Sequence, residues 1–103
     1  MSENKLILFS RMGCCLCEGL EIRLKKISLD NLNPPVKLCV RDVDAVNVPK
    51  LEKELYSLHV PVLIVELDRP VRRFELPRVS PRLSEEGLFN WLQKKMCEKL
   101  NKS

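Results

Sequence analysis

The sequence predicts a single α/β domain, residues 1–103, whose strands and helices follow the order β-α-β-α-β-β-α. Three observations predict this class. Two short runs are apolar throughout, as strands inside a covered sheet are. Two other runs alternate apolar and polar residues, as strands at a sheet edge do. Three segments carry apolar residues at helical spacing. The chain is 45% hydrophobic and 31% charged, which suits one domain with one core.

The first strand and the first helix meet at a cysteine-rich turn. Residues Lys5 to Phe9 form an apolar run that stops at Ser10-Arg11-Met12-Gly13, which predicts a central strand. From Cys14 onward, apolar residues recur on one helical face, which predicts a helix of about four turns. These residues are Leu16, Leu20, Leu24 and Ile27. The segment Asn33-Pro34-Pro35 cannot continue a helix, so the first helix ends before it.

The middle of the chain predicts an edge strand and a shorter helix. Residues 36–41 alternate apolar and polar side chains, which is the period of a half-exposed strand. The stretch from Asn47 to Leu58 carries Leu51, Leu55 and Leu58 at helical spacing. Pro49 is tolerated there only in a first turn.

The last third predicts two strands and a helix. Val62 to Val65 is apolar throughout, which predicts a second central strand. A turn through Arg69 and Pro70 then leads to the mixed segment Val71 to Leu76, a second edge strand. A final helix begins at Ser84-Glu85-Glu86. Its apolar residues are Leu88, Trp91, Leu92 and Met96.

These elements predict one sheet with helices on both faces. We expect the first three strands to run parallel, with the first and third side by side in the middle. Active sites of such sheets lie beyond the carboxyl ends of the strands. The loop after the first strand brings Cys14 to that end.

Glycine, histidine and hydropathy exclude several classes of protein. The three glycines cannot form a GxGxxG or GxxxxGK[ST] loop, which excludes nucleotide enzymes of those types. The single histidine, His59, excludes zinc sites that need two. No apolar run approaches the roughly 18 residues of a membrane span. The start of the chain does not read as a secretory signal, so a cytoplasmic protein is expected.

Five cysteines, three of them within four positions, indicate thiol chemistry. They are too few for a disulfide scaffold, and clustered cysteines without an export signal indicate a reducing compartment. Cys14 and Cys17 form a Cys-x-x-Cys motif at the predicted start of the first helix. Unpaired N–H groups and the helix macrodipole favour the thiolate of Cys14 there. We therefore expect Cys14 to attack a substrate disulfide and Cys17 to resolve the mixed disulfide.

Other roles for the cysteines stay open. The cluster could bind a soft metal ion or share an iron–sulfur cluster between subunits, which makes a non-enzymatic metal carrier the second function class. Cys15 is a third thiol with no assigned role. Cys39, part-way along an edge strand, and Cys97, near the end of the chain, are expected to be structural or incidental.

The cysteine loop and two further segments carry a family resemblance. They are Ser10-Arg11-Met12-Gly13-Cys14-Cys15-Leu16-Cys17-Glu18, Asp42-Val43-Asp44 and His59-Val60-Pro61-Val62-Leu63. Together these segments resemble the glutaredoxin-like family, and especially its small branch with a Cys-x-Leu-Cys motif. The order of the elements agrees along nearly the whole chain.

The resemblance implies a thioredoxin fold, in which a four-stranded mixed sheet is flanked by three helices. It also implies a thiol-disulfide oxidoreductase that reduces protein disulfides or glutathione-mixed disulfides. Cys14 would be the nucleophile and Cys17 the resolving thiol. Pro61 would be a cis-proline, and the Val60 backbone would pair with the substrate. We assign Arg11 to substrate binding together with Val60 and Pro61.

Glutathione-using members of this family commonly have a glycine turn after the fourth strand. Residues Phe74 to Arg82 contain no glycine, so the close backbone approach that glycine permits is not provided here. No bound cofactor is expected, and glutathione is an alternative co-substrate to a protein disulfide.

Arginines gather on the second edge strand and just after it. They are Arg69, Arg72, Arg73, Arg78 and Arg82, against the single acid Glu75, so their local charge of 5 − 1 = +4 equals the net charge of the protein. Charges on an edge strand oppose pairing with another chain. The same patch could orient an acidic partner, which makes an interaction module the third function class. We expect a monomer whose partner is a disulfide-bearing protein or glutathione, and neither nucleic acid nor a membrane.

Overall fold

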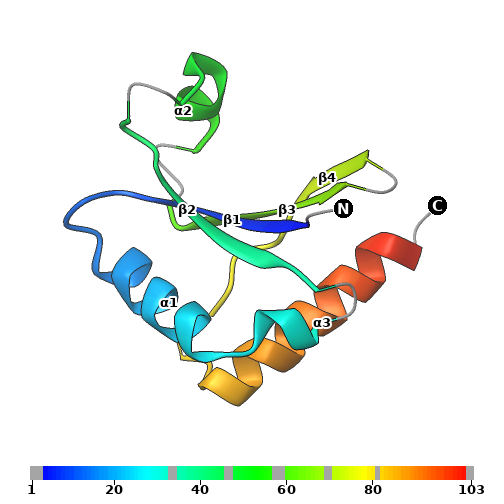
Figure 1. Ribbon diagram of the computed structural model, residues 1–103. Coiled ribbons are helices and arrows are strands. Elements are labelled where there is room, and N and C mark those ends of the chain that lie inside the picture. The colour runs from blue at the N-terminus through cyan, green and yellow to red at the C-terminus, as the bar shows by residue number, and fades with distance from the viewer. Residues whose placement is uncertain are drawn as a thin grey trace.

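The computed structural model describes residues 4–32, 35–45, 48–56, 60–68, 71–80 and 82–101 (Figure 1). Its elements are β1 (Lys5–Ser10), α1 (Cys15–Lys26), the 3-10 helix η1 (Leu29–Asn31), β2 (Lys37–Asp42), α2 (Lys50–Tyr56), β3 (Val62–Asp68), β4 (Val71–Glu75) and α3 (Glu85–Asn101). Several residues used above lie outside the described part, so the expectations placed on them stay predictions. They are Asn33, Pro34, Asn47, Leu58, His59, Arg69 and Pro70.

The four strands form one mixed sheet in the order β2-β1-β3-β4. The two continuously apolar strands therefore lie inside the sheet and the two alternating strands at its edges, as predicted. β1 pairs in parallel with β2, whereas β3 runs antiparallel to both β1 and β4. The prediction that the first three strands run parallel is wrong for β3.

The chain leaves β2 and enters β3 at the same end of the sheet, which makes β3 antiparallel. β2 ends at Asp42, opposite Ser10, and β3 begins beside Phe9. A parallel β3 would need a crossover that carries the chain to the opposite end of the sheet. The connection through α2 instead brings the chain back at the end where β2 leaves.

Helices α1 and α3 lie together on one side of the sheet, and α2 lies on the other side (Figure 1). The larger core fills the space between the sheet and helices α1 and α3. Its fully buried members include Leu6, Leu8, Leu20, Leu24, Leu88, Leu92 and Met96. Alternate residues of β1 face the opposite side, in a smaller core. That core contains Ile7, Phe9, Val43, Val48, Val62 and Ile64.

Two leucines that the helical spacing placed on buried faces are exposed. Leu51 on α2 is 67% exposed, and Leu16 in the first turn of α1 is 46% exposed. Leu20 and Leu24 are buried as predicted. The buried face of α1 begins at Cys17 rather than at Leu16, and Leu16 is left at the surface beside the cysteines.

Helix α3 begins where the sequence predicts it. The Ser84 hydroxyl oxygen accepts a hydrogen bond from the Gly87 N–H at 3.1 Å, which caps the helix. Glu85 and Glu86 follow in the first turn, where the macrodipole favours acidic side chains. Within the described ranges, no helix combines the length and the apolar character that crossing a bilayer requires.

The two classes of leucine give a matched test of this packing. Leu92→Ala removes a fully buried side chain from the larger core, so we expect it to lower the free energy of unfolding by about 2–5 kcal/mol. Leu51→Ala makes the same chemical change at an exposed position and should alter that free energy by no more than about 0.5 kcal/mol. Urea unfolding of the two variants measures both effects. Equal losses would contradict the described core.

Candidate active site

The loop after β1 carries the cysteine motif to one end of the sheet. The Val43 N–H donates to the Ser10 carbonyl at 2.9 Å, which ties the end of β1 to the chain leaving β2. The Cys14 N–H donates to the Arg11 carbonyl at 3.1 Å, which closes a tight turn. Gly13 in this turn has φ +84°, a left-handed backbone conformation that residues with a side chain rarely adopt. The turn therefore places Cys14 directly before α1.

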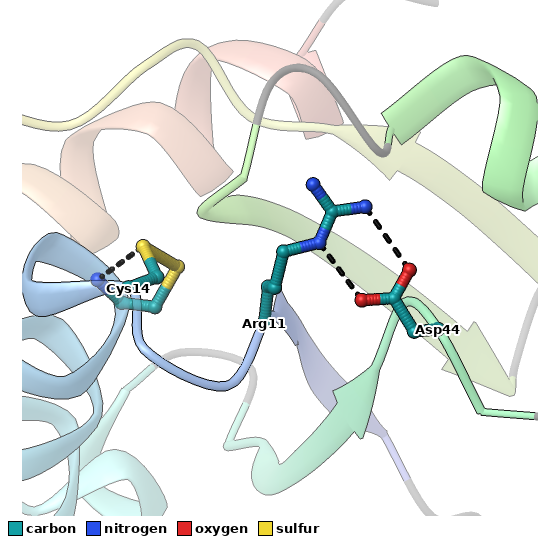
Figure 2. Close-up of a disulfide and its surroundings, with 4 residues drawn as sticks. Arg11, Cys14 and Asp44 are labelled. Carbon is teal, nitrogen blue, oxygen red and sulfur yellow. Dashed lines mark hydrogen bonds and ion pairs between the residues drawn. A yellow bond between two sulfur atoms is a disulfide. The ribbon is translucent and has the colours of Figure 1, made fainter.

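Cys14 and Cys17 are joined by a disulfide, with their Cα atoms 5.2 Å apart (Figure 2). Cys14 is the N-cap of α1, and its Sγ accepts a hydrogen bond from the Cys17 N–H at 3.1 Å. Amide groups in a first helical turn have no partner within the helix, so this one is available to sulfur. Cys14 is half-buried, whereas Cys17 is only 1% exposed. Solvent and a partner therefore reach the first cysteine and not the second.

The other three cysteines are not in a disulfide. Cys15 is exposed next to the motif, and Cys39 packs against the smaller core. Cys97 is exposed on α3, where its Sγ accepts a hydrogen bond from the Gln93 amide at 3.5 Å. Among the described residues, no three side chains of His, Cys, Asp or Glu come together in a way that could hold a metal ion.

A cis-proline lies beside the first turn of α1. The Val60–Pro61 peptide bond is cis, as the family resemblance implies. Pro61 and the exposed Leu16 line one small pocket, and Pro61 also lines a neighbouring cavity of about 210 Å³. Arg78 and Val79 line both. The two cavities form a groove, the Pro61 groove, that runs from the start of α1 to the segment after β4.

Arg11 is held in a bidentate ion pair with Asp44. Its Nε lies 2.8 Å from Asp44 Oδ2 and its Nη2 lies 3.0 Å from Asp44 Oδ1. Figure 2 shows the guanidinium beside the cysteine turn and directed toward Asp44. The hydrogen bonds and the opposite charges lower the pKa of the Asp44 carboxyl and raise the pKa of the Arg11 guanidinium. Arg11, predicted to bind substrate, thus already has a partner.

The arginines near β4 do not form one uniform basic face. Arg73 Nη1 lies 3.9 Å from Oε2 of Glu66 on β3. Arg72 Nη1 donates a hydrogen bond to the Leu100 carbonyl of α3, at 3.5 Å. Arg78 instead lines the Pro61 groove. Of these three arginines, Arg78 is therefore the one that lines the candidate site.

The sequence did not place Leu16, Arg78 or Asp44 at the cysteine site. It assigned Leu16 to the apolar face of the first helix, Arg78 to the arginine patch and Asp44 to a segment that carries the family resemblance. The groove residues could not be found from the sequence, because only the folded structure shows that the cis-proline loop and the segment after β4 lie side by side. The sequence did contain a signal from which the ion pair could have been predicted. Parallel β1 and β2 bring Ser10 opposite Asp42, so charged residues just after the two strands meet. Arg11 and Asp44 are such residues, with opposite charge.

Replacing Arg11 tests the ion pair directly. In Arg11→Met, we expect the pKa of Asp44 to rise toward its ordinary value, because the carboxylate loses its hydrogen bonds and the nearby positive charge. Because the pKa in the folded protein is lowered, the pair stabilises the fold above the ordinary carboxyl pKa. That contribution is lost as the pH falls through the lowered value. Carboxyl ¹³C NMR titration measures the shift, with the carboxyls of α3 as controls. An Asp44 titration that is the same in both proteins would refute the pairing.

Comparison with known proteins agrees with this geometry. The glutaredoxin-like domain family (DUF836) matches residues 5–93, which include Cys14 and Cys17, the cis-proline and about half of α3. No curated protein matches the sequence significantly. The match covers most of the chain, and the disulfide at the start of α1 lies inside it. The chain belongs to the glutaredoxin-like domain (DUF836) family.

Proposed function

We propose that the protein is a thiol-disulfide oxidoreductase of thioredoxin fold, which reduces protein disulfides or glutathione-mixed disulfides through Cys14 and Cys17. One observation carries the proposal. The two cysteines are within disulfide distance at the start of α1, and one is accessible while the other is buried. A purely structural disulfide would not need this asymmetry at a helix terminus.

The first step uses the accessible sulfur. In the reduced protein, the Cys14 thiolate attacks one sulfur of the substrate disulfide, and the other substrate sulfur leaves as a thiolate. The Cys17 N–H and the positive end of the helix macrodipole stabilise negative charge at Cys14 Sγ. The product of this step is a mixed disulfide between Cys14 and the substrate.

The second step uses the buried sulfur. The Cys17 thiolate attacks Cys14 Sγ, the mixed disulfide breaks, and the substrate leaves as its second thiolate. Two electrons have then passed from the protein dithiol to the substrate, and the protein holds the Cys14–Cys17 disulfide. Because Cys17 is shielded from solvent, an external disulfide does not compete for it.

The substrate would lie along the Pro61 groove. We assign the Val60 backbone to pairing with an extended substrate chain next to the disulfide and Pro61 to contact with its side chains. Leu16 and Val79 offer apolar surface in the same groove. Arg11, in the cysteine turn, is the group that would meet an acidic substrate. We expect the protein to act as a monomer in the cytoplasm, with no bound cofactor and with glutathione or a protein thiol as reductant.

Trapping the mixed disulfide tests this mechanism. Cys17→Ser should accumulate a covalent adduct on Cys14 when the reduced protein reacts with a disulfide substrate, because the resolving thiol is missing. Cys14→Ser should form no adduct at Cys17. Intact-mass spectrometry with peptide mapping identifies the modified residue.

Cys15→Ser provides the matched control, since it removes a neighbouring and more exposed thiol. This variant should complete the reaction and end with the Cys14–Cys17 disulfide. If Cys17→Ser forms no adduct on Cys14, or if Cys15→Ser blocks the reaction, the assigned roles are wrong.

A further inference from the structure

The proposed function assigns Arg11 to substrate binding and leaves its ion-pair partner, Asp44, without a role. Arg11 is three residues before the nucleophile, and its carbonyl accepts the Cys14 N–H. The rest of the turn is Met12 and Gly13, which carry no charge, so Arg11 supplies the positive charge of this loop. Its side chain is 38% exposed and can meet a bound substrate.

Asp44 is held in position by the backbone around it. Its N–H donates to Asp42 Oδ1 at 2.9 Å, and the Ala45 N–H donates to the Asp42 carbonyl at 3.0 Å. The parallel pairing of β1 and β2 brings this turn beside the cysteine loop. The carboxylate is therefore a fixed partner that engages the guanidinium with both of its oxygens.

A fixed internal carboxylate competes with any carboxylate that a substrate brings. The internal partner is present at a high effective concentration, and a substrate acid must displace it or share the guanidinium. The pair has no net charge, so it exerts little attraction on an approaching anion. The structure thus places a cation in the loop that carries the reactive sulfur and neutralises it.

We propose that Asp44 is a specificity-determining residue, which withholds Arg11 from anionic substrates and thereby disfavours disulfides with carboxylates next to the sulfur. This inference rests on the proposed function. Glutathione disulfide belongs to the disfavoured class, because each half carries two carboxylates. Disulfides within extended, uncharged protein segments belong to the favoured class. In the Pro61 groove, Leu16, Pro61 and Val79 offer apolar surface to such segments, and Arg23 and Arg78 line the same pocket.

Two small disulfides of similar size test this proposal. One is neutral, bis(2-hydroxyethyl) disulfide, and the other is the dianion 3,3′-dithiodipropionate. The reduced protein is mixed with each disulfide in excess, and its second-order rate of oxidation is measured at pH 7. The readout is the ratio of the dianion rate to the neutral rate within one variant. Loss of folded protein lowers both rates together and leaves this ratio unchanged.

Asp44→Asn should raise the ratio about threefold, the size of a single exposed ion-pair interaction. The gain should shrink at high salt, because exposed charges are screened. In the double variant Arg11→Met with Asp44→Asn, the gain should disappear, since the freed cation is absent. Glu98→Gln makes the same change in net charge on α3 and should leave the ratio as in the wild type.

Three results would overturn the proposal. The ratio could stay unchanged in Asp44→Asn, the double variant could show the full gain, or Glu98→Gln could show it too. Failure of the proposed oxidoreductase function gives a different result. In that case, the reduced wild-type protein would form no Cys14–Cys17 disulfide with either compound.

Discussion

Strand β1 is buried on both faces and paired along both edges, and the site depends on this constraint. Leu6, Ile7, Leu8 and Phe9 are all fully buried, so β1 can shift neither along nor across the sheet. The end of the strand at Ser10 is therefore fixed. The turn that follows starts α1 at Cys15, and the helix packs on the sheet through Leu20 and Leu24. Cys14 is held between these two anchored elements.

The chemistry of the site is supplied mainly by the backbone. The group that meets Cys14 Sγ is the Cys17 N–H, and its orientation follows from the start of the helix. No acidic or basic side chain is needed to activate the sulfur in the mechanism proposed above. The charged pair beside it, Arg11 with Asp44, is then available for a different purpose, selecting among substrates. In the proposals above, activation of the sulfur rests on the first turn of α1, and selection rests on Arg11 with Asp44 from the turn after β2.

Much of this arrangement could be predicted because its signals are local. Continuous apolarity identified β1 and β3 as inner strands, and the short Cys14–Cys17 spacing beside a strand end located the motif. The direction of β3 could not be predicted this way, because an apolar run has the same pattern in both directions. It follows from where the connection through α2 returns the chain to the sheet, which is the end where β2 leaves it.

The features that were missed depend on contacts between distant residues. Leu16 has the spacing of the buried face of α1, but it is exposed and lines the Pro61 groove, whose walls come from three parts of the chain. Arg11 and Asp44 are 33 residues apart, and only the register between β1 and β2 brings them together. In the proposals above, the groove and the ion pair select the substrate, and both depend on contacts that a local sequence pattern does not carry.

In the proposed mechanism, the helix terminus, rather than exposure, makes Cys14 the reactive thiol. Timed alkylation of the reduced protein with iodoacetamide at pH 7, followed by peptide mapping, measures the reactivity of each cysteine. Cys15 is the more exposed of the two neighbours, and Cys17 is buried. We expect Cys14 to be labelled first and Cys17 to stay unlabelled. Labelling of Cys15 before Cys14, or of Cys17 as fast as Cys14, would show that the helix terminus does not set the reactivity.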